Sequence, residues 1–300
     1  MRMSQHPRVS VVIASIVGPP FIDECLDSLE QQAKQSGAEV IVVACGSAEY
    51  ADRIARKFPW VRIIHRAARE TVPGLRRHGV EEASGEIVAI IEEHCLAAPD
   101  WLRQASEAFA GGDFGVVGGP VVDHAYVRLR DWVVYFCEYN NYLPPWQEGG
   151  AHDLGSANIA YSRAVLLKYK DLLSNGYWEA GLHPRLMADG VKFHAVPAML
   201  VHHRGPFNYR YYLQQRYWFS RAFAGARQLP ASRKAVYLLA SPLVPFVLLA
   251  RIAMRVLSKH CRVDKFAQSL PLLIPALIVY VAGEFVGYLA GPGDALLKVE

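Results

Sequence analysis

Carboxylate, imidazole and guanidinium side chains stand at a few points of the sequence, each shortly after an apolar run. Glu92, Glu93 and His94 directly follow the apolar residues 87–91, and Arg76 lies earlier in the chain. Carboxylates and imidazoles are ligands for divalent metal ions, and imidazole suits softer first-row ions better than Mg²⁺. A guanidinium group pairs well with phosphate oxygens. These residue types are suited to metal binding, phosphate binding and proton transfer.

The elements that must position these side chains are visible in the alternation of apolar runs and helical patterns. We predict strands at 9–14, 39–43, 61–65 and 87–91, separated by helices at 21–33, 50–58, 73–83 and 101–110. Continuous apolar strands joined through helices predict a parallel sheet covered on both faces. Ligands bind beyond the carboxyl ends of the strands in such sheets, so the residues just after each strand are the site candidates.

Composition limits the class of protein. The 300 residues are 52% hydrophobic, enough for one core of about 200 to 250 residues and an appendage. A net charge of +4 is too mild for a dedicated nucleic-acid binder, so we expect no nucleic-acid partner. Five scattered cysteines without a CxxC pair argue for a reducing compartment. The first apolar run is too short for a signal peptide and is expected to be a strand.

Motifs spread over residues 8–228 resemble, in order and spacing, the family 2 glycosyltransferases with a GT-A nucleotide-sugar-binding fold. The matching segments in chain order are Ala14-Ser15-Ile16-Val17, Val43-Ala44-Cys45-Gly46-Ser47, Leu75-Arg76-Arg77, Glu92-Glu93-His94 with Pro99-Asp100-Trp101-Leu102, Ser156-Ala157-Asn158-Ile159-Ala160, Trp178-Glu179 with Arg185-Leu186, Pro197 to His203, and Gln214-Gln215-Arg216-Tyr217-Trp218. The resemblance implies a mostly parallel twisted α/β sheet flanked by helices.

The resemblance also implies a set of roles. Donor contacts are expected from Ala14, Ser15, Cys45, Gly46, Ser47, Arg76, Glu92, Glu93 and Asn158. A divalent metal would be held by Glu92, His94 and His203, with Mn²⁺ favoured over Mg²⁺ because two ligands are imidazoles; His202 competes with His203 for this place. Glu179 would be the general base that takes the proton of the acceptor hydroxyl, and the expected stereochemical course is inversion.

The sequence departs from the family pattern at several of these positions. Ala44 and Cys45 replace the two aspartates that would hold the nucleotide base, which leaves the nucleotide open. The metal motif is Glu-x-His in place of Asp-x-Asp, and Trp178 interrupts the acidic pair next to Glu179. Asp-x-His followed by Cys occurs in some metal-dependent GT-A transferases, so we interpret the motif as a variant.

The last 70 residues differ in character from the rest. We predict a catalytic domain at 1–230, with a donor half at about 8–122 and an acceptor half at about 123–230, and a membrane-associated segment at 231–300. Its apolar stretch 269–290 would extend about 33 Å as a helix and can cross a hydrocarbon core of about 30 Å. The stretch 235–250 would reach only about 24 Å.

Basic residues flank the shorter stretch on both sides, and positive flanks prefer the cytoplasm. We therefore expect 235–250 to be re-entrant or to lie at the interface, with the second stretch crossing or re-entering and the catalytic domain cytoplasmic at the cell membrane. A two-span hairpin and a helix pair buried in protein are the alternatives. Membrane attachment favours a lipid-linked or glycan acceptor.

Other functions compete with a transferase that uses a nucleotide-sugar donor. The main alternative is a catalytically degenerate GT-A relative that binds a nucleotide sugar or a partner without turnover, which Ala44, Cys45 and Ala180 motivate. A processive polysaccharide synthase would need more membrane spans and a Gln-x-x-Arg-Trp helix. A nucleotidyltransferase would need a glycine-rich phosphate loop after the first strand, and residues 16–20 do not form one.

Overall fold

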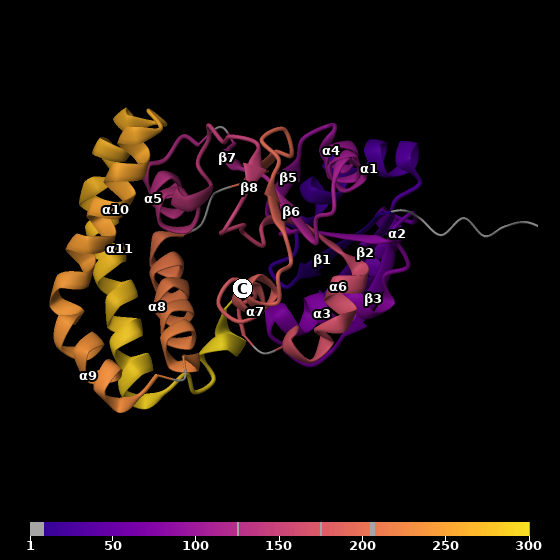
Figure 1. Ribbon diagram of the computed structural model, residues 1–300. Coiled ribbons are helices and arrows are strands. Elements are labelled where there is room, and N and C mark those ends of the chain that lie inside the picture. The colour runs from indigo at the N-terminus through magenta and orange to yellow at the C-terminus, as the bar shows by residue number, and fades with distance from the viewer. Residues whose placement is uncertain (1–8, 125, 175, 205–207, 228, 300) are drawn as a thin grey trace, which may run out of the picture. The chain divides into compact units, whose positions relative to one another are not determined.

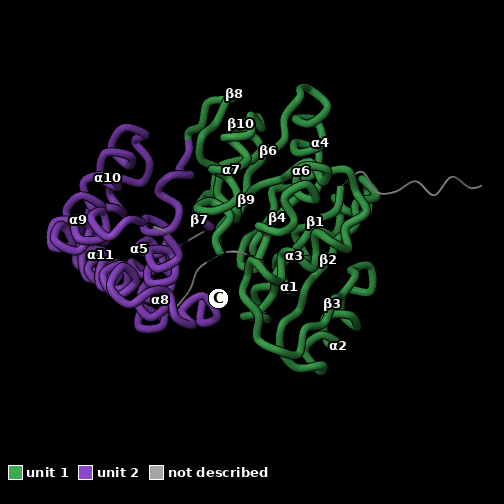
Figure 2. The backbone as a smooth tube through the Cα atoms, turned by 60° about the horizontal axis from the view of Figure 1, so that its bottom comes forward, with its two compact units in different colours: residues 1–122, 145–204 green, residues 123–144, 205–300 purple. Residues whose placement is uncertain are grey.

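The computed structural model describes residues 9–299 except 125, 175, 205–207 and 228. The chain divides into two compact units (Figure 2). Unit 1 comprises residues 1–122 and 145–204, and unit 2 comprises residues 123–144 and 205–300. The two units are described separately below.

Unit 1 is built on one mixed sheet of eight strands in the order β3-β2-β1-β4-β9-β6-β10-β8. The strands are β1 (Val9–Ser15), β2 (Glu39–Cys45), β3 (Arg62–Arg66), β4 (Ile87–Ile91), β6 (Val116–Gly118), β8 (Gly149–Gly150), β9 (Asn158–Ser162) and β10 (Phe193–Ala195). The first four strands are parallel, and β9 pairs antiparallel with both β4 and β6. The predicted parallel half is confirmed, because its runs of Val and Ile are buried on both faces.

Helices cover both faces of this sheet (Figure 1). They are α1 (Phe21–Ser36), α2 (Ala48–Lys57), α3 (Val72–Glu82), α4 (Trp101–Gly111), α6 (Arg163–Lys168) and α7 (Leu182–Ala188), with a short 3₁₀ turn η2 (Lys170–Leu172). Side-chain caps fix where two helices begin after strands. Ser47 accepts the N–H of Tyr50 at the start of α2, and Thr71 accepts the N–H of Gly74 at the start of α3.

A second sheet of three short strands adjoins the carboxyl end of β4 in the sequence. Its order is β5 (Cys95–Ala97), β11 (Val201–His203) and β7 (Val121–Asp123). β11 pairs antiparallel with β5, so His203 lies opposite Cys95. This pairing brings the predicted strand at 197–203 to the predicted metal motif, although about one hundred residues separate them in the chain.

Unit 2 is helical. It contains α5 (Leu129–Glu138), η1 (Asn140–Tyr142), α8 (Tyr209–Ala226), α9 (Ala231–Ala240), η3 (Ser241–Leu243), α10 (Val244–Ser258), α11 (Val263–Ala290) and η4 (Ala295–Lys298). The segments 123–144 and α8, predicted to belong with the catalytic domain, are grouped by their contacts with the C-terminal helices. The functional boundary at residue 230 stays a prediction.

Two stretches of unit 2 are long and apolar enough to cross a membrane. They are Ala231–Ser258, which comprises α9, η3 and α10, and Val263–Ala290, which is α11; each has 28 residues. The predicted apolar stretches 235–250 and 269–290 lie inside them. The first stretch changes from α-helix to 3₁₀ geometry at Ser241–Leu243, which contains Pro242.

Candidate functional site

The loop between β1 and α1 is held by the buried carboxylate of Glu93. The backbone N–H groups of Ile16 and Val17 donate to Oε1 at 2.8 and 2.7 Å. The N–H of Gly18 and the hydroxyl of Ser15 donate to Oε2 at 3.0 and 2.6 Å. Glu93 is only 5% exposed. The structure therefore gives Glu93 the role of anchoring the loop, and a direct contact with a donor, which the sequence predicts, stays a prediction.

The same loop is tied to the end of β2 through Tyr50 of α2. Its hydroxyl makes a short hydrogen bond with the hydroxyl of Ser15. Its ring packs on Gly18, where the φ of +81° favours glycine and an added Cβ would lie only 3.2 Å from the ring. Ser47 caps α2 one turn before Tyr50. The predicted donor contacts Ser15 and Ser47 therefore belong to one connected edge of the sheet.

The position between β2 and α2 carries no carboxylate. Ala44 is fully buried, and Cys45 is 6% exposed with its thiol donating to the carbonyl oxygen of Ala68 at 3.4 Å. Gly46 follows with a φ of +141°, a conformation that favours glycine. Ala14 is half-buried at the end of β1 beside this edge. A nucleotide base bound here would meet backbone and small side chains in place of an acidic pair.

Glu92, His94 and Cys95 form a cluster at the carboxyl end of β4. Their ligand atoms lie within 4.8 Å of one another. Nε2 of His94 is 3.2 Å from one carboxylate oxygen of Glu92, and the guanidinium of Arg76 is 3.3 Å from the other. Burial alternates along this segment, with Glu92 and His94 half-buried and Glu93 and Cys95 buried. The spacing Glu-x-His therefore places the two predicted metal ligands together.

His203 of β11 lies next to His94 of this cluster. Its ring centroid lies 5.1 Å from that of His94, with the two planes perpendicular. His203 is buried at 1% exposure, whereas His202 is half-buried. Successive side chains of a strand point to opposite faces, so the structure favours His203 over His202 as the third ligand candidate. Burial, and secondly the neighbouring His94, lower the pKa of His203 well below its usual range, which keeps the imidazole neutral as a metal ligand must be.

The donor set fits a divalent first-row ion. A carboxylate and two imidazoles are ligands that divalent first-row ions accept. Cys95 is the neighbour that the sequence analysis did not assign. Burial, followed by the charge of Glu92, raises the pKa of the Cys95 thiol well above its usual range, so the group is a protonated and weak ligand in the metal-free chain.

Arg76 connects the cluster to the next part of the site. It stands on α3, is 6% exposed, and its guanidinium carbon lies 5.9 Å from the centre of the Trp178 ring. Stacking on an aromatic face and pairing with Glu92 fix the orientation of the planar guanidinium. Its burial shows that Arg76 does not stand on an exposed helix face.

Glu179 follows Trp178 and is held by Ser156. The N–H of Ser156 donates to Oε1 of Glu179 at 2.8 Å, and the Ser156 hydroxyl makes a short hydrogen bond to the same oxygen. Trp178 is buried and donates its indole N–H to the carbonyl oxygen of Leu173 at 2.7 Å. The carboxylate therefore has a fixed position, with two donors on one oxygen. Its part as a base is untested by this geometry and stays a prediction.

Asn158 connects three neighbouring segments through hydrogen bonds of its side chain. The side chain is fully buried, and its oxygen accepts the indole N–H of Trp101 at 2.7 Å. Its amide donates to the carbonyl oxygens of Pro120 and Met199 at 2.9 and 2.6 Å. Both amide hydrogens are therefore engaged within the protein. The structure assigns Asn158 to the support of the site, and the predicted donor contact stays a prediction.

A family model described as glycosyl transferase family 2 matches residues 10–170 of the chain. Among curated relatives, glycosyltransferase AglE of Haloferax volcanii is 30% identical over 123 residues, which are 39% of this chain and 40% of that protein. Glucosyl-dolichyl phosphate glucuronosyltransferase of the same organism is 25% identical over 178 residues, 54% of each protein. The chain thus matches about half or less of the length of these relatives.

Solved structures are similar over a longer part of the chain. The mannosyltransferase PcManGT from Pyrobaculum calidifontis, in complex with GDP-Man and Mn²⁺, superposes with a TM-score of 0.55 at 18% identity, covering 96% of this chain and 88% of that chain. At this identity the likeness shows the fold alone, and it confirms the predicted GT-A type. Because the family model covers more than half of the 300 residues, the chain belongs to the family 2 glycosyltransferases.

Proposed function

We propose that the chain transfers a sugar from a nucleotide-sugar donor to a lipid-linked or glycan acceptor, with inversion, at the cytoplasmic face of the cell membrane. The observation that carries the proposal is the cluster of Glu92, His94 and His203 beside Arg76 at the carboxyl end of β4. This is the edge of an α/β sheet at which ligands bind. The cluster offers metal ligands and a phosphate-binding cation at one place.

Glu92, His94 and His203 would hold the divalent ion, Mn²⁺ in preference to Mg²⁺ because two of the three ligands are imidazoles. When bound, the ion supplies positive charge that offsets the charge developing on the departing nucleoside diphosphate. Arg76 would bind a phosphate oxygen from the other side of Glu92, because its guanidinium is already oriented by the Trp178 ring. Mn²⁺ in the PcManGT complex is consistent with this assignment.

Glu179 would take the proton from the acceptor hydroxyl. Both hydrogen bonds from Ser156 go to Oε1, so we assign Oε2 to the proton transfer. A positioned base contributes about 10²- to 10⁴-fold to the rate, equivalent to roughly 3 to 5 kcal/mol of barrier. A base on the face of the sugar opposite to the diphosphate gives inversion in one displacement.

The donor would lie along the edge formed by Ala14, Ser15, Cys45, Gly46 and Ser47. The backbone there is fixed by the Glu93 carboxylate and the Tyr50 hydroxyl, which favours a preformed site. The acidic pair expected for a uracil base is missing, so the nucleotide must be read by other groups. GDP-sugars are included among the candidate donors because the similar PcManGT structure holds GDP-Man.

The acceptor class follows from the two apolar stretches of unit 2. A transferase held at a bilayer by such stretches meets acceptors that are anchored in the same bilayer. One relative is named a glucosyl-dolichyl phosphate glucuronosyltransferase, an enzyme that acts on a sugar attached to a lipid phosphate. A lipid-linked saccharide is therefore the acceptor class that we propose first.

The proposal is tested by hydrolysis of a panel of UDP-, GDP- and dTDP-sugars with Mn²⁺, Mg²⁺ or a chelator. We expect turnover of one donor with Mn²⁺, loss of that turnover with chelator, and a decrease of at least about 100-fold in His94→Ala and His203→Ala. His202→Ala is the matched control, since this neighbour points to the other face of β11 and should keep near wild-type activity.

Three outcomes would contradict the proposal. Tight donor binding without turnover, also in the presence of a membrane lipid extract, would favour the degenerate relative that binds without catalysis. Equal losses in the His202→Ala and His203→Ala variants would show that β11 is only sensitive to disruption, and that His203 is no metal ligand. Failure to bind any donor with either metal would remove the assignment of the site altogether.

A further inference from the structure

Within unit 2, helix α8 runs alongside α11 in the same direction. The hydroxyl of Tyr209 donates to the carbonyl oxygen of Leu272 at 2.5 Å. Eleven residues further along each helix, Gly283 lies so close to Ser220 that an added Cβ would be 2.1 Å from its hydroxyl oxygen. The two helices therefore stay in register through the apolar part of α11. If α11 crossed a bilayer along its axis, α8 would cross the bilayer beside it.

Helix α8 has a polar outer side, and the C-terminal turn folds back onto its middle. Arg210 and Gln214 of α8 are exposed. Nε2 of Gln215 donates to the carbonyl oxygen of Lys298 at 3.1 Å, and the Lys298 ammonium lies 4.2 Å from the centre of the Trp218 ring. The charged groups of the last turn thus lie level with the centre of α8, and by the register above with the centre of the apolar part of α11.

Lys298 also pairs with Asp294 at 3.0 Å, with side chains 43% and 60% exposed. If α11 crossed a bilayer, this exposed ion pair would be placed in the hydrocarbon core together with the polar side of α8. Charged groups at that depth are rare in membrane helices and are found in protein interiors or water-filled cavities when they occur. The side of unit 2 formed by α8 and η4 must therefore face water.

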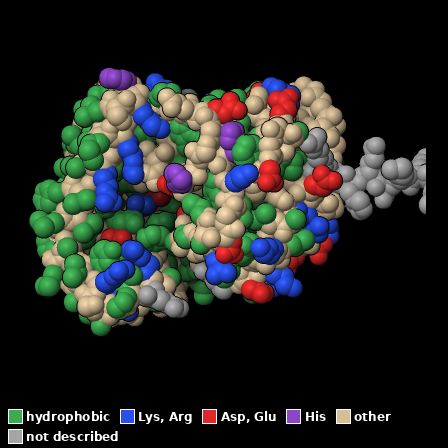
Figure 3. All heavy atoms as spheres, viewed as in Figure 1, with side chains coloured by type: hydrophobic (Ala, Val, Ile, Leu, Met, Phe, Trp, Pro, Cys, Tyr) green, Lys and Arg blue, Asp and Glu red, His purple; other side chains and the backbone are tan. Residues whose placement is uncertain are grey.

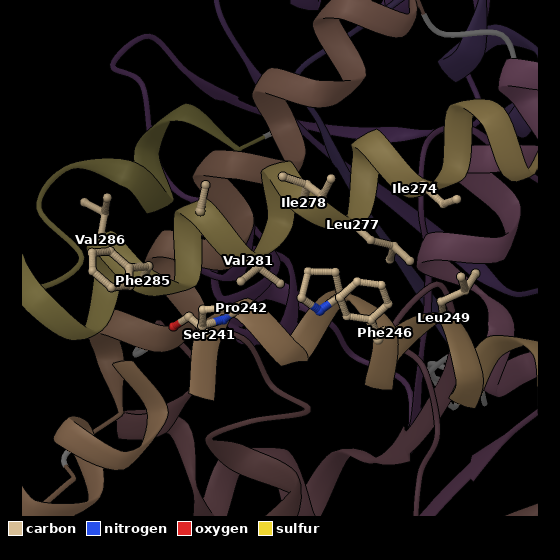
Figure 4. Close-up of a pocket in the computed structure, with 12 residues that line it drawn as sticks. Ser241, Pro242, Phe246, Leu249, Ile274, Leu277, Ile278, Val281, Phe285 and Val286 are labelled. Atoms are coloured by element: carbon tan, nitrogen blue, oxygen red, sulfur yellow. The ribbon is translucent and has the colours of Figure 1, made fainter. Parts of the chain in front are cut away.

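The opposite side of unit 2 is apolar. Large hydrophobic side chains are exposed on α9, α10 and the outer side of α11, among them Leu239, Leu243, Phe246, Ile274, Ile278 and Phe285. In Figure 3 hydrophobic side chains cover the margin formed by α9 and α10. A groove of about 570 Å³ opens between α10 and α11, and the side chains that line it are shown in Figure 4. Exposed apolar surface of this extent marks an interaction site.

Basic residues flank the apolar side. Arg251 and Arg255 of α10 and Lys259 directly after it lie at spacings of four and form a stripe on one flank; Arg251 is exposed, whereas Arg255 and Lys259 are half-buried and donate to the side-chain oxygen of Asn140 and the carbonyl oxygen of Leu143. Leu249, which lines the groove, precedes Arg251 by two positions, about 200° around a helix, so the groove opens away from this stripe. Arg233 and Lys234 provide positive charge at the other end of the hairpin. Basic residues at both ends attract anionic lipid headgroups on one side of a membrane.

We infer that α9, α10 and α11 lie in the plane of a bilayer that contains anionic lipid, and do not cross it. The apolar outer side and the groove face the acyl chains, the basic stripe lies at the headgroups, and α8 with η4 faces water. This arrangement rests on the proposed function of a membrane-attached transferase and gives it a definite orientation. It differs from the sequence prediction in that the second apolar stretch does not need to cross the membrane.

The side of the membrane on which each end of the α9–α10 stretch lies tests whether this stretch crosses the bilayer. Cys261 is half-buried in the turn before α11, while the other four cysteines are buried. Ala231→Cys in a Cys261→Ser background places the reporter at the exposed start of α9. The full chain is treated with a membrane-impermeant maleimide in intact spheroplasts and in inverted inner-membrane vesicles. We expect both reporters to react from the same face of the membrane, the cytoplasmic one. Reaction of the two reporters from opposite faces would overturn the inference.

Depth is measured with a fluorophore on Leu243→Cys, at the end of η3 directly before α10, and, separately, on Leu257→Cys of α10; both positions are exposed. The two positions are about 21 Å apart along the helix. Lipids with a nitroxide at shallow or deep acyl positions should quench both fluorophores with the same preference if α10 lies in the plane. A deeper location of residue 243 than of residue 257 would indicate a crossing or re-entrant helix and would contradict the inference.

The failure of this inference is distinguishable from failure of the proposed function. Donor hydrolysis, measured on each labelled variant, verifies that the protein is folded and tests the catalytic proposal by itself. A chain that hydrolyses donor but stays in the supernatant after centrifugation with vesicles of phosphatidylglycerol and phosphatidylethanolamine would refute the membrane arrangement and leave the catalytic site standing. A chain that binds the vesicles but does not hydrolyse donor would refute the catalytic proposal and leave the membrane arrangement standing.

Discussion

Glu92 and Glu93 are adjacent, identical side chains, and the structure predicts opposite consequences for their loss. Glu93→Gln replaces one oxygen of the buried carboxylate with an amide group. If the amide takes the place of Oε1, the N–H groups of Ile16 and Val17 both lose their acceptor. If it takes the place of Oε2, Gly18 loses its acceptor, while the Ser15 hydroxyl can turn to accept. The second arrangement costs less free energy, and we expect the variant to adopt it.

The magnitude follows from that arrangement. One buried backbone N–H without an acceptor costs about 1 to 3 kcal/mol, and the bonds to the remaining oxygen lose the strength that a charged acceptor gives, roughly 1 kcal/mol each. Relief from burying a negative charge offsets part of this cost. We therefore expect the free energy of unfolding to decrease by about 2 to 4 kcal/mol in Glu93→Gln. At a urea dependence of about 2 kcal/mol per molar, the unfolding midpoint decreases by about 1 to 2 M.

The assay combines urea unfolding in detergent with hydrogen exchange of the amides of residues 16–18. Glu92→Gln is the control, because this variant touches none of the loop amides and keeps an oxygen for Arg76. Glu93→Gln should accelerate exchange in the loop, while Glu92→Gln should leave the exchange unchanged and abolish metal-dependent turnover. A change in the free energy of unfolding below about 1 kcal/mol in Glu93→Gln, with unchanged exchange, would refute the anchoring role.

Two further substitutions test other parts of the site, and a third tests the buried His183 of α7, whose Nε2 lies 2.6 Å from the hydroxyl oxygen of Tyr161. Arg76→Lys loses the planar group that stacks on Trp178, and should raise the KM for the donor about tenfold with little change in unfolding. Ser156→Ala removes one hydrogen bond to Glu179, and kcat with acceptor should decrease about tenfold at constant donor affinity. Burial lowers the pKa of His183, so the native state stays neutral while the unfolded state gains a proton below pH of about 6.5. The free energy of unfolding should thus decrease as pH falls from there, by up to about 1.4 kcal/mol per pH unit. In His183→Gln this decrease should be less steep when urea unfolding is measured between about pH 5 and 7.5. Equal slopes in the wild type and the variant would contradict the explanation.

The strands and their ends were accessible from the sequence because the signal is local. Uninterrupted runs of Val and Ile, such as 87–91, can only be satisfied by burial on both faces of a sheet. The polar residues that follow such a run are thereby placed at the ligand-binding edge. The alternation of burial from Glu92 to Cys95 then brings Glu92 and His94 to the same side. The parallel half of the sheet and the edge that carries Glu92 and His94 therefore followed from short stretches of chain.

The direction in which a strand-end side chain points was not accessible in the same way. Glu93 and Asn158 have the residue types of ligand-binding groups, and both hydrogen-bond to other parts of the protein. Their partners lie 75 to 78 residues away for Glu93 and 38 to 57 residues away for Asn158. Pairings at such separations depend on the assembled sheet. A pattern of residue types gives the edge of the sheet, but the division into ligands and supports needs tertiary contacts.

Tertiary contacts also limit what the hydropathy of α11 can predict about its position in a membrane. The length and apolarity of 263–290 satisfy the requirement for a span, although Glu284 places one carboxyl group within its apolar part. The contrary argument comes from α8, which is too polar to span, and from Lys298, which lies over Trp218 of α8. Both are fixed to α11 by contacts between segments about 60 to 80 residues apart. A helix that must share its depth with a charged neighbour cannot be assigned to the bilayer core by its own composition, and the water-facing side of α8 therefore takes precedence over the hydropathy of α11.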